Sequence, residues 1–140
     1  VLEAAPDVLN HNVETVKELQ RAVRSKASYE RSLFVLQYCK EHGKNIRTKT
    51  GFMVGLGETE EQIEELMRDV YDTGCDILTI GQYLQPTKLH YPLARYASPE
   101  DFQRYKEKAL KIGFRFVASA PLARSSYKAW EVMEDVHDLY

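Results

Sequence analysis

The chain has 140 residues, a formal net charge of -2 and 29% charged residues. This balance describes an ordinary water-exposed surface and indicates neither a nucleic-acid partner nor a membrane-surface helix, and no apolar run approaches the roughly 18 residues that cross a bilayer. The length allows at most one domain. Because the sequence lacks an initiator methionine and starts in mid-pattern at Val1, we expect a piece of a longer protein, so that missing targeting signals mean little.

Apolar residues alternate between short strand-like runs and stripes with helical spacing. We expect strands over 7–12, 46–54, 77–84 and 114–119. Helices are expected through Val13, Val16, Leu19 and Val23, from a Ser28 cap to Gly43, from Thr59 to Gly74, from Ser98 to Gly113, and over 127–139. Four strands separated by helices predict an α/β fold of parallel βα units, about half of an eight-unit TIM-type barrel. Such a half exposes sheet edges, so we expect another segment or a second copy beside it.

The stretch from Phe52 to Gln62 joins a strand, a glycine turn and a helix start. Phe52–Val54 has the character of a buried strand, and Gly55 and Gly57 allow a positive φ or a close backbone approach at its carboxyl end. Thr59 and Gln62 form a capping-box pattern. Parallel α/β folds hold ligands at such junctions, which predicts a small-molecule site.

The chain contains two cysteines, Cys39 and Cys75, far apart in sequence and each in an apolar setting. No CxxC or CxxxCxxC spacing occurs. This chain alone therefore cannot hold a zinc ion or an all-cysteine iron–sulfur cluster. We expect two buried free thiols.

Four runs occur together in one order: Leu9-Asn-His-Asn-Val-Glu-Thr15, Gly51-x-Met-x-Gly-x-x-Glu58, Thr79-Ile-Gly-Gln-Tyr-Leu-Gln-Pro86 and Arg124-Ser-Ser-Tyr127. With these runs the chain resembles lipoyl synthase, a family of radical S-adenosylmethionine (SAM) enzymes, to about Glu131. The third and fourth runs are specific to that family. One departure is Ala120-Pro-Leu-Ala123, where the family usually reads Gly-Pro-Leu/Met-Val, and the family's two cysteine motifs are absent. The resemblance implies that residues 1–140 are the C-terminal half of a radical SAM barrel, with a cluster-ligand motif near 124–127.

The resemblance also implies a reaction. Lipoyl synthases insert sulfur at C6 and C8 of an octanoyl chain by 5′-deoxyadenosyl radical chemistry, using SAM and two [4Fe–4S] clusters, one of which is consumed. The fragment alone is expected to bind neither cluster and to be inactive. Implied partners are the missing N-terminal half, an octanoylated lipoyl carrier protein or lipoyl domain, and an electron donor such as ferredoxin or flavodoxin. The implied compartment is the cytoplasm in a bacterium, or the mitochondrion or plastid in a eukaryote.

Three polar residues lie near the ends of expected strands. Asn12 and Glu14 can be a helix cap and a first-turn charge. By resemblance to radical SAM relatives they instead reach the SAM ribose and its neighbourhood, since an amide and a carboxylate suit vicinal hydroxyls. Lys49 is either a solvated edge lysine or points into the barrel toward a carboxylate, such as that of SAM.

The second and third runs supply further candidates. Gly55 and Gly57 suit a close approach to the methionyl or adenosyl part of SAM, or a purely steric turn. Glu58 is a further candidate for SAM contact and equally a charge at a helix N-terminus. Gln82 and Gln85 carry amides that can pair with an adenine edge.

The run Arg124–Tyr127 is, by composition, a turn that caps a following helix, with an arginine able to grip an anion. The resemblance implies that Ser125 or Ser126 binds an iron of the auxiliary cluster through oxygen, a harder ligand than thiolate. Spacing does not decide between the two serines.

The long loop between 85 and 99 carries three basic side chains that could meet an acidic carrier protein or simply be solvated: Lys88, His90 and Arg95. Two other functions stay open. One is another sulfur-inserting radical SAM enzyme, similar to biotin synthase. The other is a catalytically silent α/β module that binds a small molecule.

Overall fold

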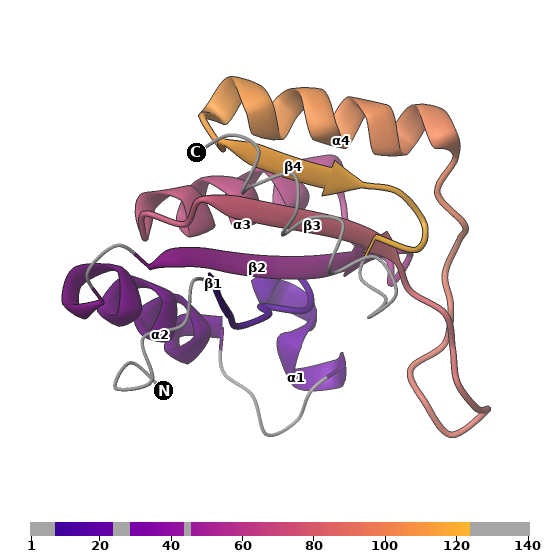
Figure 1. The fold of residues 1–140 in the computed structure, drawn as a ribbon. Helices are drawn as coiled ribbons and strands as arrows, with labels where there is room; N and C mark the ends of the chain where they lie inside the picture. Colours follow the sequence, from indigo (N-terminus) through magenta and orange to yellow (C-terminus); the bar gives the residue numbers. More distant parts are fainter. Residues whose placement is uncertain (1–7, 24–28, 44–45, 124–140) are drawn as a thin grey trace.

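The computed structural model describes residues 8–23, 29–43 and 46–123. Within them, four parallel strands form one sheet in the order β1-β2-β3-β4 (Figure 1). The strands are β1 Val8–Asn10, β2 Arg47–Val54, β3 Ile77–Gln82 and β4 Phe116–Ser119. Strand order follows chain order, as in part of a βα barrel, whereas a doubly wound sheet reverses its order at a switch point. The predicted α/β fold of parallel βα units is confirmed.

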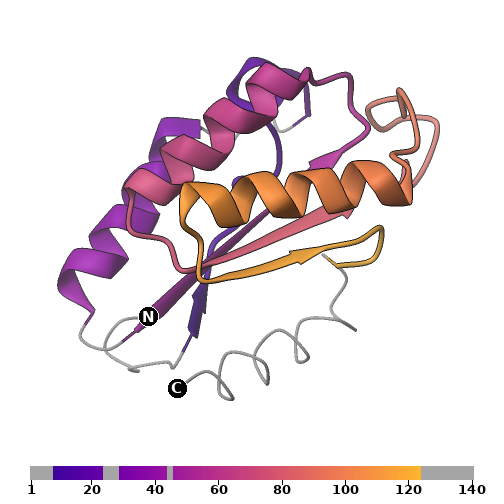
Figure 2. The ribbon, with the colours of Figure 1, turned by 90° about the horizontal axis from the view of Figure 1, so that it is seen from above.

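Three helices cover one face of this sheet: α2 Tyr29–His42, α3 Glu60–Asp72 and α4 Pro99–Ile112 (Figure 2). A short 3-10 turn, η2 Lys17–Leu19, and one helical turn, α1 Gln20–Val23, follow β1. The main core lies between helices and sheet. Its largest members with almost no exposed surface include Phe52, Leu66, Met67, Leu78 and Tyr105.

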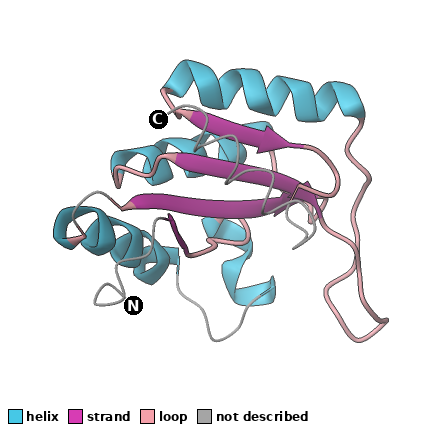
Figure 3. Ribbon diagram, in the orientation of Figure 1, coloured by secondary structure: helices cyan, strands magenta, loops and turns pink. Residues whose placement is uncertain are grey.

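The opposite face of the sheet has its own small apolar cluster, formed by Ile77 with Val8, Phe116 and Ala118. Side chains alternate between the two faces of a strand. Since Phe52 and Val54 belong to the helix-side core, Lys49 and Met53 lie on this second face. None of the described helices covers it (Figure 3). This face corresponds to the inside of a barrel.

The helix boundaries follow the predicted caps. Thr59 and Gln62 form the reciprocal capping box that begins α3, whose buried residues are the predicted Ile63, Leu66, Met67 and Val70. Ser98 and Asp101 form a second capping box before α4. Gly113 ends α4 with a φ of 131°, and Gly74 follows α3 with a φ of 88°. The predicted Ser28 cap and the predicted helix over 127–139 lie outside the described residues.

Several predicted boundaries were wrong. The strand expected over 7–12 ends at Asn10. The strand over 77–84 ends at Gln82, and the strand over 114–119 begins only at Phe116. The helical stripe from Val13 to Val23 is not one helix, although Val13 and Val16 are buried. The reason is that Glu14 forms a β-bridge with Phe52, so the chain continues beside β2 before it coils.

Both cysteines are free and buried, as predicted. Burial raises the pKa of the Cys75 thiol to about 12, so it carries almost no thiolate at neutral pH. Among the described helices, none combines the length and the apolar character needed to cross a bilayer.

Candidate functional site at the carboxyl edge of the sheet

Four segments leave the strands at one edge of the sheet. Residues 11–15 follow β1, residues 55–58 follow β2, residues 84–97 follow β3 and residues 120–123 follow β4. The arrowheads in Figure 1 all point to this edge. In parallel α/β folds this is the edge that binds ligands.

The segment after β1 contains a strained turn, here called the Glu14 turn (Val13–Thr15). Glu14 has a φ of 77°, and it alone among the described non-glycine residues has a positive φ. The amide of Thr15 donates to the carbonyl of Val13 at 3.0 Å, which closes a three-residue γ-turn around Glu14. Such turns are rare, and a non-glycine residue held in one costs on the order of 1–3 kcal/mol.

Hydrogen bonds from two sides hold the Glu14 turn in place. The buried amide of Gln20 donates to the carbonyls of Val13 and Thr15, both at 2.7 Å. On the strand side, the hydroxyl of Thr50 accepts from the Val13 amide at 3.1 Å. The backbone of Glu14 also pairs with Gly51 and Met53 of β2. A strained turn persists when its surroundings determine it this fully, and such turns cluster at functional sites.

Asn12 directly precedes this turn, whereas Lys49 lies nearer the amino end of β2. The amide of His11 donates to the carbonyl of Lys49 at 3.0 Å, and partly buried Asn12 is the next residue. Lys49 is 6% exposed and stands on the barrel-side face between Asn10 and Ile77. It is therefore not a solvated edge lysine, and its contact with a carboxylate stays a prediction.

The segment after β2 is here called the glycine turn (Gly55–Gly57). The carboxylate of Glu58, the next residue, accepts hydrogen bonds from its backbone. Gly55 and Gly57 have φ values of 101° and 108°. The Glu58 carboxylate, 8% exposed, accepts hydrogen bonds from the Gly55 amide at 3.1 Å and the Leu56 amide at 3.0 Å. Glu58 thereby fixes the shape of the turn from within, and its direct contact with SAM stays a prediction.

The two glycines of this turn have different surroundings. A Cβ on Gly55 would lie 2.4 Å from Nε2 of Gln82 and 2.5 Å from the carbonyl oxygen of Arg95. A Cβ on Gly57 would meet no atom within 4 Å. Gly55 is therefore needed for close packing inside the chain, whereas Gly57 faces open space that a ligand can enter.

The segment after β3, here called the arm (residues 84–97), is bonded to the glycine turn at its base. The side-chain amide of Gln82 donates to the carbonyls of Tyr83 and Arg95, both at 3.0 Å, and accepts from the amide of Ala97 at 2.9 Å. The carbonyl of Gly55 accepts from the amide of Ala94 at 2.8 Å. Because the Gln82 amide is engaged within the chain, its pairing with adenine stays a prediction.

Arg95 anchors the arm to the start of α4. Its guanidinium contacts the Asp101 carboxylate at 3.1 Å and donates to the hydroxyl of buried Tyr105 at 2.8 Å. The backbone amide of Ser98, with Arg104 and Arg95, holds the pKa of Asp101 well below its usual range, so that carboxylate is charged at neutral pH. Arg95 is therefore paired, whereas the sequence suggested a surface charge.

Sequence reasoning missed both the Glu14 turn and the bonds at the base of the arm. The capping pattern around Glu14 resembles an ordinary helix start, and the partners of Gln82 lie up to 15 residues away in sequence. The positive φ of Glu14 has no signal in the sequence. The glycines were recognised, although the reason for Gly55 lies in Gln82 and Arg95.

The predicted iron ligands Ser125 and Ser126 lie outside the described residues. The described chain before them follows the edge of the sheet. The backbone amide of Ala120 donates to the carbonyl of Ile80 at 3.1 Å. The backbone amide of Gln82 donates to the carbonyl of Pro121 at 3.0 Å. Within 8–23, 29–43 and 46–123, no group of three or more His, Cys, Asp or Glu residues could hold a metal ion.

A surface pocket of about 390 Å³ lies away from this edge, at the opposite ends of the strands. Its lining includes Tyr71, Asp76, Gly113 and Arg115 together with Cys75, a residue that is 3% exposed. A deeply buried thiol that stays protonated is not a nucleophile. The pocket therefore does not compete with the carboxyl edge as the candidate site.

Comparison with known proteins shows which proteins the chain is similar to. The model of the radical SAM superfamily matches residues 1–70. The lipoyl synthase of Alkaliphilus metalliredigens is 55% identical over 134 residues, which cover 96% of this chain and 46% of that protein. The lipoyl synthase of Rubrobacter xylanophilus is 57% identical over 135 residues, which cover 96% of this chain and 42% of that protein. The lipoyl synthase of Chlorobaculum tepidum is 52% identical over 139 residues. The chain thus spans less than half the length of the curated relatives it matches.

Proposed function

Because the chain belongs to the radical SAM superfamily, we propose that it is part of a lipoyl synthase, which inserts two sulfur atoms into a protein-bound octanoyl chain. The observation that carries this proposal is the similarity to lipoyl synthases at 55% and 57% identity over 96% of the chain. The substrate is then an octanoylated lipoyl carrier protein or lipoyl domain, and ferredoxin or flavodoxin is the electron donor. In a bacterium the enzyme would act in the cytoplasm.

Bound SAM would supply a 5′-deoxyadenosyl radical in the presence of a [4Fe–4S] cluster. The residues at the carboxyl edge fit such a cofactor: Gly57 faces open space, and a strained backbone presents Glu14 beside β2. We assign Asn12 and Glu14 to the ribose hydroxyls, because an amide and a carboxylate can both accept from them. Lys49, on the barrel-side face, is suited to the methionyl carboxylate.

Gly55, Glu58 and Gln82 contribute to this site through the shape of the backbone. Glu58 holds the amides of Gly55 and Leu56, and Gln82 holds the arm against Gly55. Their work is to keep Gly57 at the cofactor and to limit access of water. A radical must react with its substrate before it reacts with another hydrogen donor. A site with a fixed shape that excludes water therefore matters more here than proton transfer.

Two clusters require ligands beyond the described residues. We propose that Ser125 or Ser126 binds one iron of the auxiliary cluster and that cysteines in the remainder of the enzyme supply the other ligands. Iron and sulfide analysis after anaerobic reconstitution tests this assignment. The 140-residue chain alone should retain no cluster, and the full-length enzyme should retain two.

The function itself is tested by mass spectrometry of an octanoyl-lysine peptide incubated with the reconstituted full-length enzyme, SAM and a reductant. The expected product carries two sulfur atoms in place of two hydrogens, at C6 and C8. Sulfur insertion into dethiobiotin, with the octanoyl peptide unchanged, would instead assign the enzyme to the biotin synthase type. SAM cleavage without sulfur insertion into either compound would reject both.

A further inference from the structure

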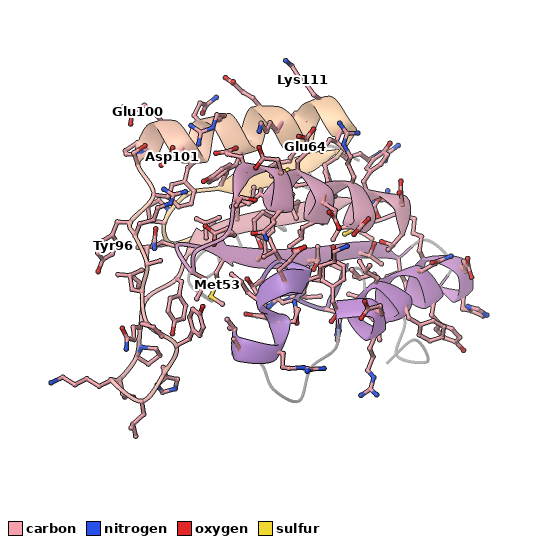
Figure 4. All side chains as sticks on the ribbon, turned by 180° about the vertical axis from the view of Figure 1, so that it is seen from behind. Met53, Glu64, Tyr96, Glu100, Asp101 and Lys111 are labelled. Atoms are coloured by element: carbon pink, nitrogen blue, oxygen red, sulfur yellow. The ribbon has the colours of Figure 1, made fainter. Side chains whose placement is uncertain are left out.

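The arm differs from the rest of the chain in charge and in exposure. Residues 84–97 contain no aspartate or glutamate, although the whole chain has a net charge of -2. At its tip, Leu89 is 97% exposed and stands between the exposed residues Lys88 and His90. Tyr96 is 70% exposed, and its side chain points away from the sheet in Figure 4. A leucine this exposed has no role in the core of the described chain.

Internal hydrogen bonds connect residues along the arm. The Gln85 amide donates to the carbonyls of Thr87 and His90 at 3.0 and 3.3 Å, and its oxygen accepts from the amide of Leu93 at 3.3 Å. Nearer the base, the hydroxyl of Tyr83 donates to the carbonyl of Tyr91. A loop that is ordered before binding loses less conformational entropy when a partner binds. An apolar side chain on such a loop is therefore suited to act as an anchor.

The position of the arm relates its tip to the site. Its base is bonded to Gly55 and Gln82 at the carboxyl edge, and its tip extends beyond the sheet (Figure 1). A partner bound at Leu89 would therefore contact the same segment whose base borders Gly55 and Gln82. The arm carries two cationic side chains. Arg95, at its base, forms an ion pair with Asp101, so the cation available to a partner is Lys88.

We propose that the arm is the docking element for the protein that carries the octanoyl chain. Leu89 fills an apolar depression on a folded carrier domain, and Lys88 faces carboxylates around that depression. An acid-free, cationic tip favours an acidic partner, and an exposed apolar side chain on it can fill a pocket at the centre of a binding interface. This inference rests on the proposed function, because a substrate chain attached to a protein requires a docking surface near the site.

The test uses the reconstituted full-length enzyme and two substrates, an octanoylated carrier domain and a short octanoyl-lysine peptide. Leu89→Asp and Lys88→Glu should each lower kcat/KM for the domain, the first by about tenfold or more. Neither should change kcat/KM for the peptide. Lys88→Glu should also reduce the salt dependence of the reaction with the domain. Leu89 is 97% exposed, so its replacement removes no core contact of the described chain.

Leu110→Asp is the matched control. Leu110 is 46% exposed on α4, so the same substitution adds a charge at an exposed leucine outside the arm. It should leave both substrates unaffected. Equal losses on domain and peptide in Leu89→Asp would overturn the proposal, since the arm would then serve the site itself. No loss on the domain, or an equal loss in Leu110→Asp, would also overturn it.

Two further outcomes separate this inference from other readings. If Leu89→Asp changes the oligomeric state in sedimentation while both substrates react normally, the arm contacts a second copy, and docking of a carrier is rejected. If the unmodified enzyme inserts sulfur into neither substrate, the proposed function fails, and the docking proposal fails with it. If all variants act on the peptide, the proposed function holds, and a failure then concerns the docking proposal alone.

Discussion

The Glu14 turn and the glycine turn meet the same backbone requirement in different ways. Both lie at the carboxyl edge, and both need a positive φ, 77° at Glu14 against 101° and 108° at Gly55 and Gly57. The glycine turn reaches this conformation with residues that have no Cβ. The Glu14 turn reaches it with hydrogen bonds donated by Gln20 and one accepted by Thr50.

This difference indicates which part of each turn is used. Glycine at position 14 would relieve the strain, yet a carboxylate stands there. We therefore propose that the side chain of Glu14, rather than its backbone, serves the site. In the glycine turn the useful element is backbone, packed against the arm at Gly55 and open to a ligand at Gly57. Four substitutions test this comparison.

Gly55→Ala should have the largest effect. The new Cβ would lie 2.5 Å from the carbonyl oxygen of Arg95, which is backbone and cannot move cheaply, and the positive φ adds strain. We expect a loss of about 3 kcal/mol or more in the free energy of unfolding, read from the urea midpoint of the full-length enzyme. Limited proteolysis should then cut within 84–97. A loss no larger than that of Gly57→Ala would contradict the packing argument.

Gln20→Leu should come next. It removes both donors from the carbonyls of Val13 and Thr15 while keeping a side chain of similar size. Because the Gln20 oxygen has no partner among the described residues, its removal offsets part of the loss, and we expect about 2 kcal/mol. SAM affinity, measured by equilibrium dialysis with the reconstituted enzyme, should fall as well. Gln103→Leu, at an exposed glutamine of α4, is the control and should change neither quantity.

Gly57→Ala measures the cost of a positive φ in the backbone without a steric clash of the new Cβ. Position 57 requires a positive φ, but its Cβ would meet no atom within 4 Å. The expected cost is therefore only about 1 kcal/mol in the same urea titration. The arm should remain resistant to protease. If the SAM affinity were unchanged too, the open space at Gly57 would not be part of the cofactor site.

Glu14→Gly should have the smallest effect on stability, and with the opposite sign. Relief of the positive φ should raise the free energy of unfolding by up to about 1 kcal/mol. Loss of the carboxylate should nevertheless weaken SAM binding by about tenfold. Glu14→Gln keeps the shape and the strain, so its stability should match that of the unmodified enzyme. A Gly variant that is less stable, or that binds SAM as tightly, would show that Glu14 serves its own backbone.

The fold could be predicted from sequence where local signals and tertiary packing agree. The capping-box pattern at Thr59 and Gln62 and the Ser98–Pro99 pair indicated the starts of α3 and α4 to the residue, because these signals lie within a few positions of one another. The stripe from Val13 to Val23 misled, because Glu14 bonds to Gly51 and Met53, more than 35 residues away, in preference to its helical neighbours. Local periodicity carries no information on such partners.

The same limit applies to the candidate site. The sequence placed Gly55, Gly57 and Gln82 at the carboxyl ends of strands. All three lie at the carboxyl edge of the sheet. It did not reveal that Gln82 and Gly55 contact each other, because the contact depends on how the arm folds back. The roles of Ser125 and Ser126 still rest on resemblance, since both lie outside the described residues.

The carboxylate of Glu58 has a consequence for ligand selectivity. A strand followed by Gly-Leu-Gly and a helix start resembles a phosphate-binding loop, in which backbone amides surround an anionic group of a nucleotide. In this chain Glu58 already supplies the anion, inside the loop, to the amides of Gly55 and Leu56. A triphosphate or pyrophosphate would have to displace a tethered negative charge and would be repelled by it. We therefore expect the glycine turn to bind no triphosphate, and ATP should not compete there.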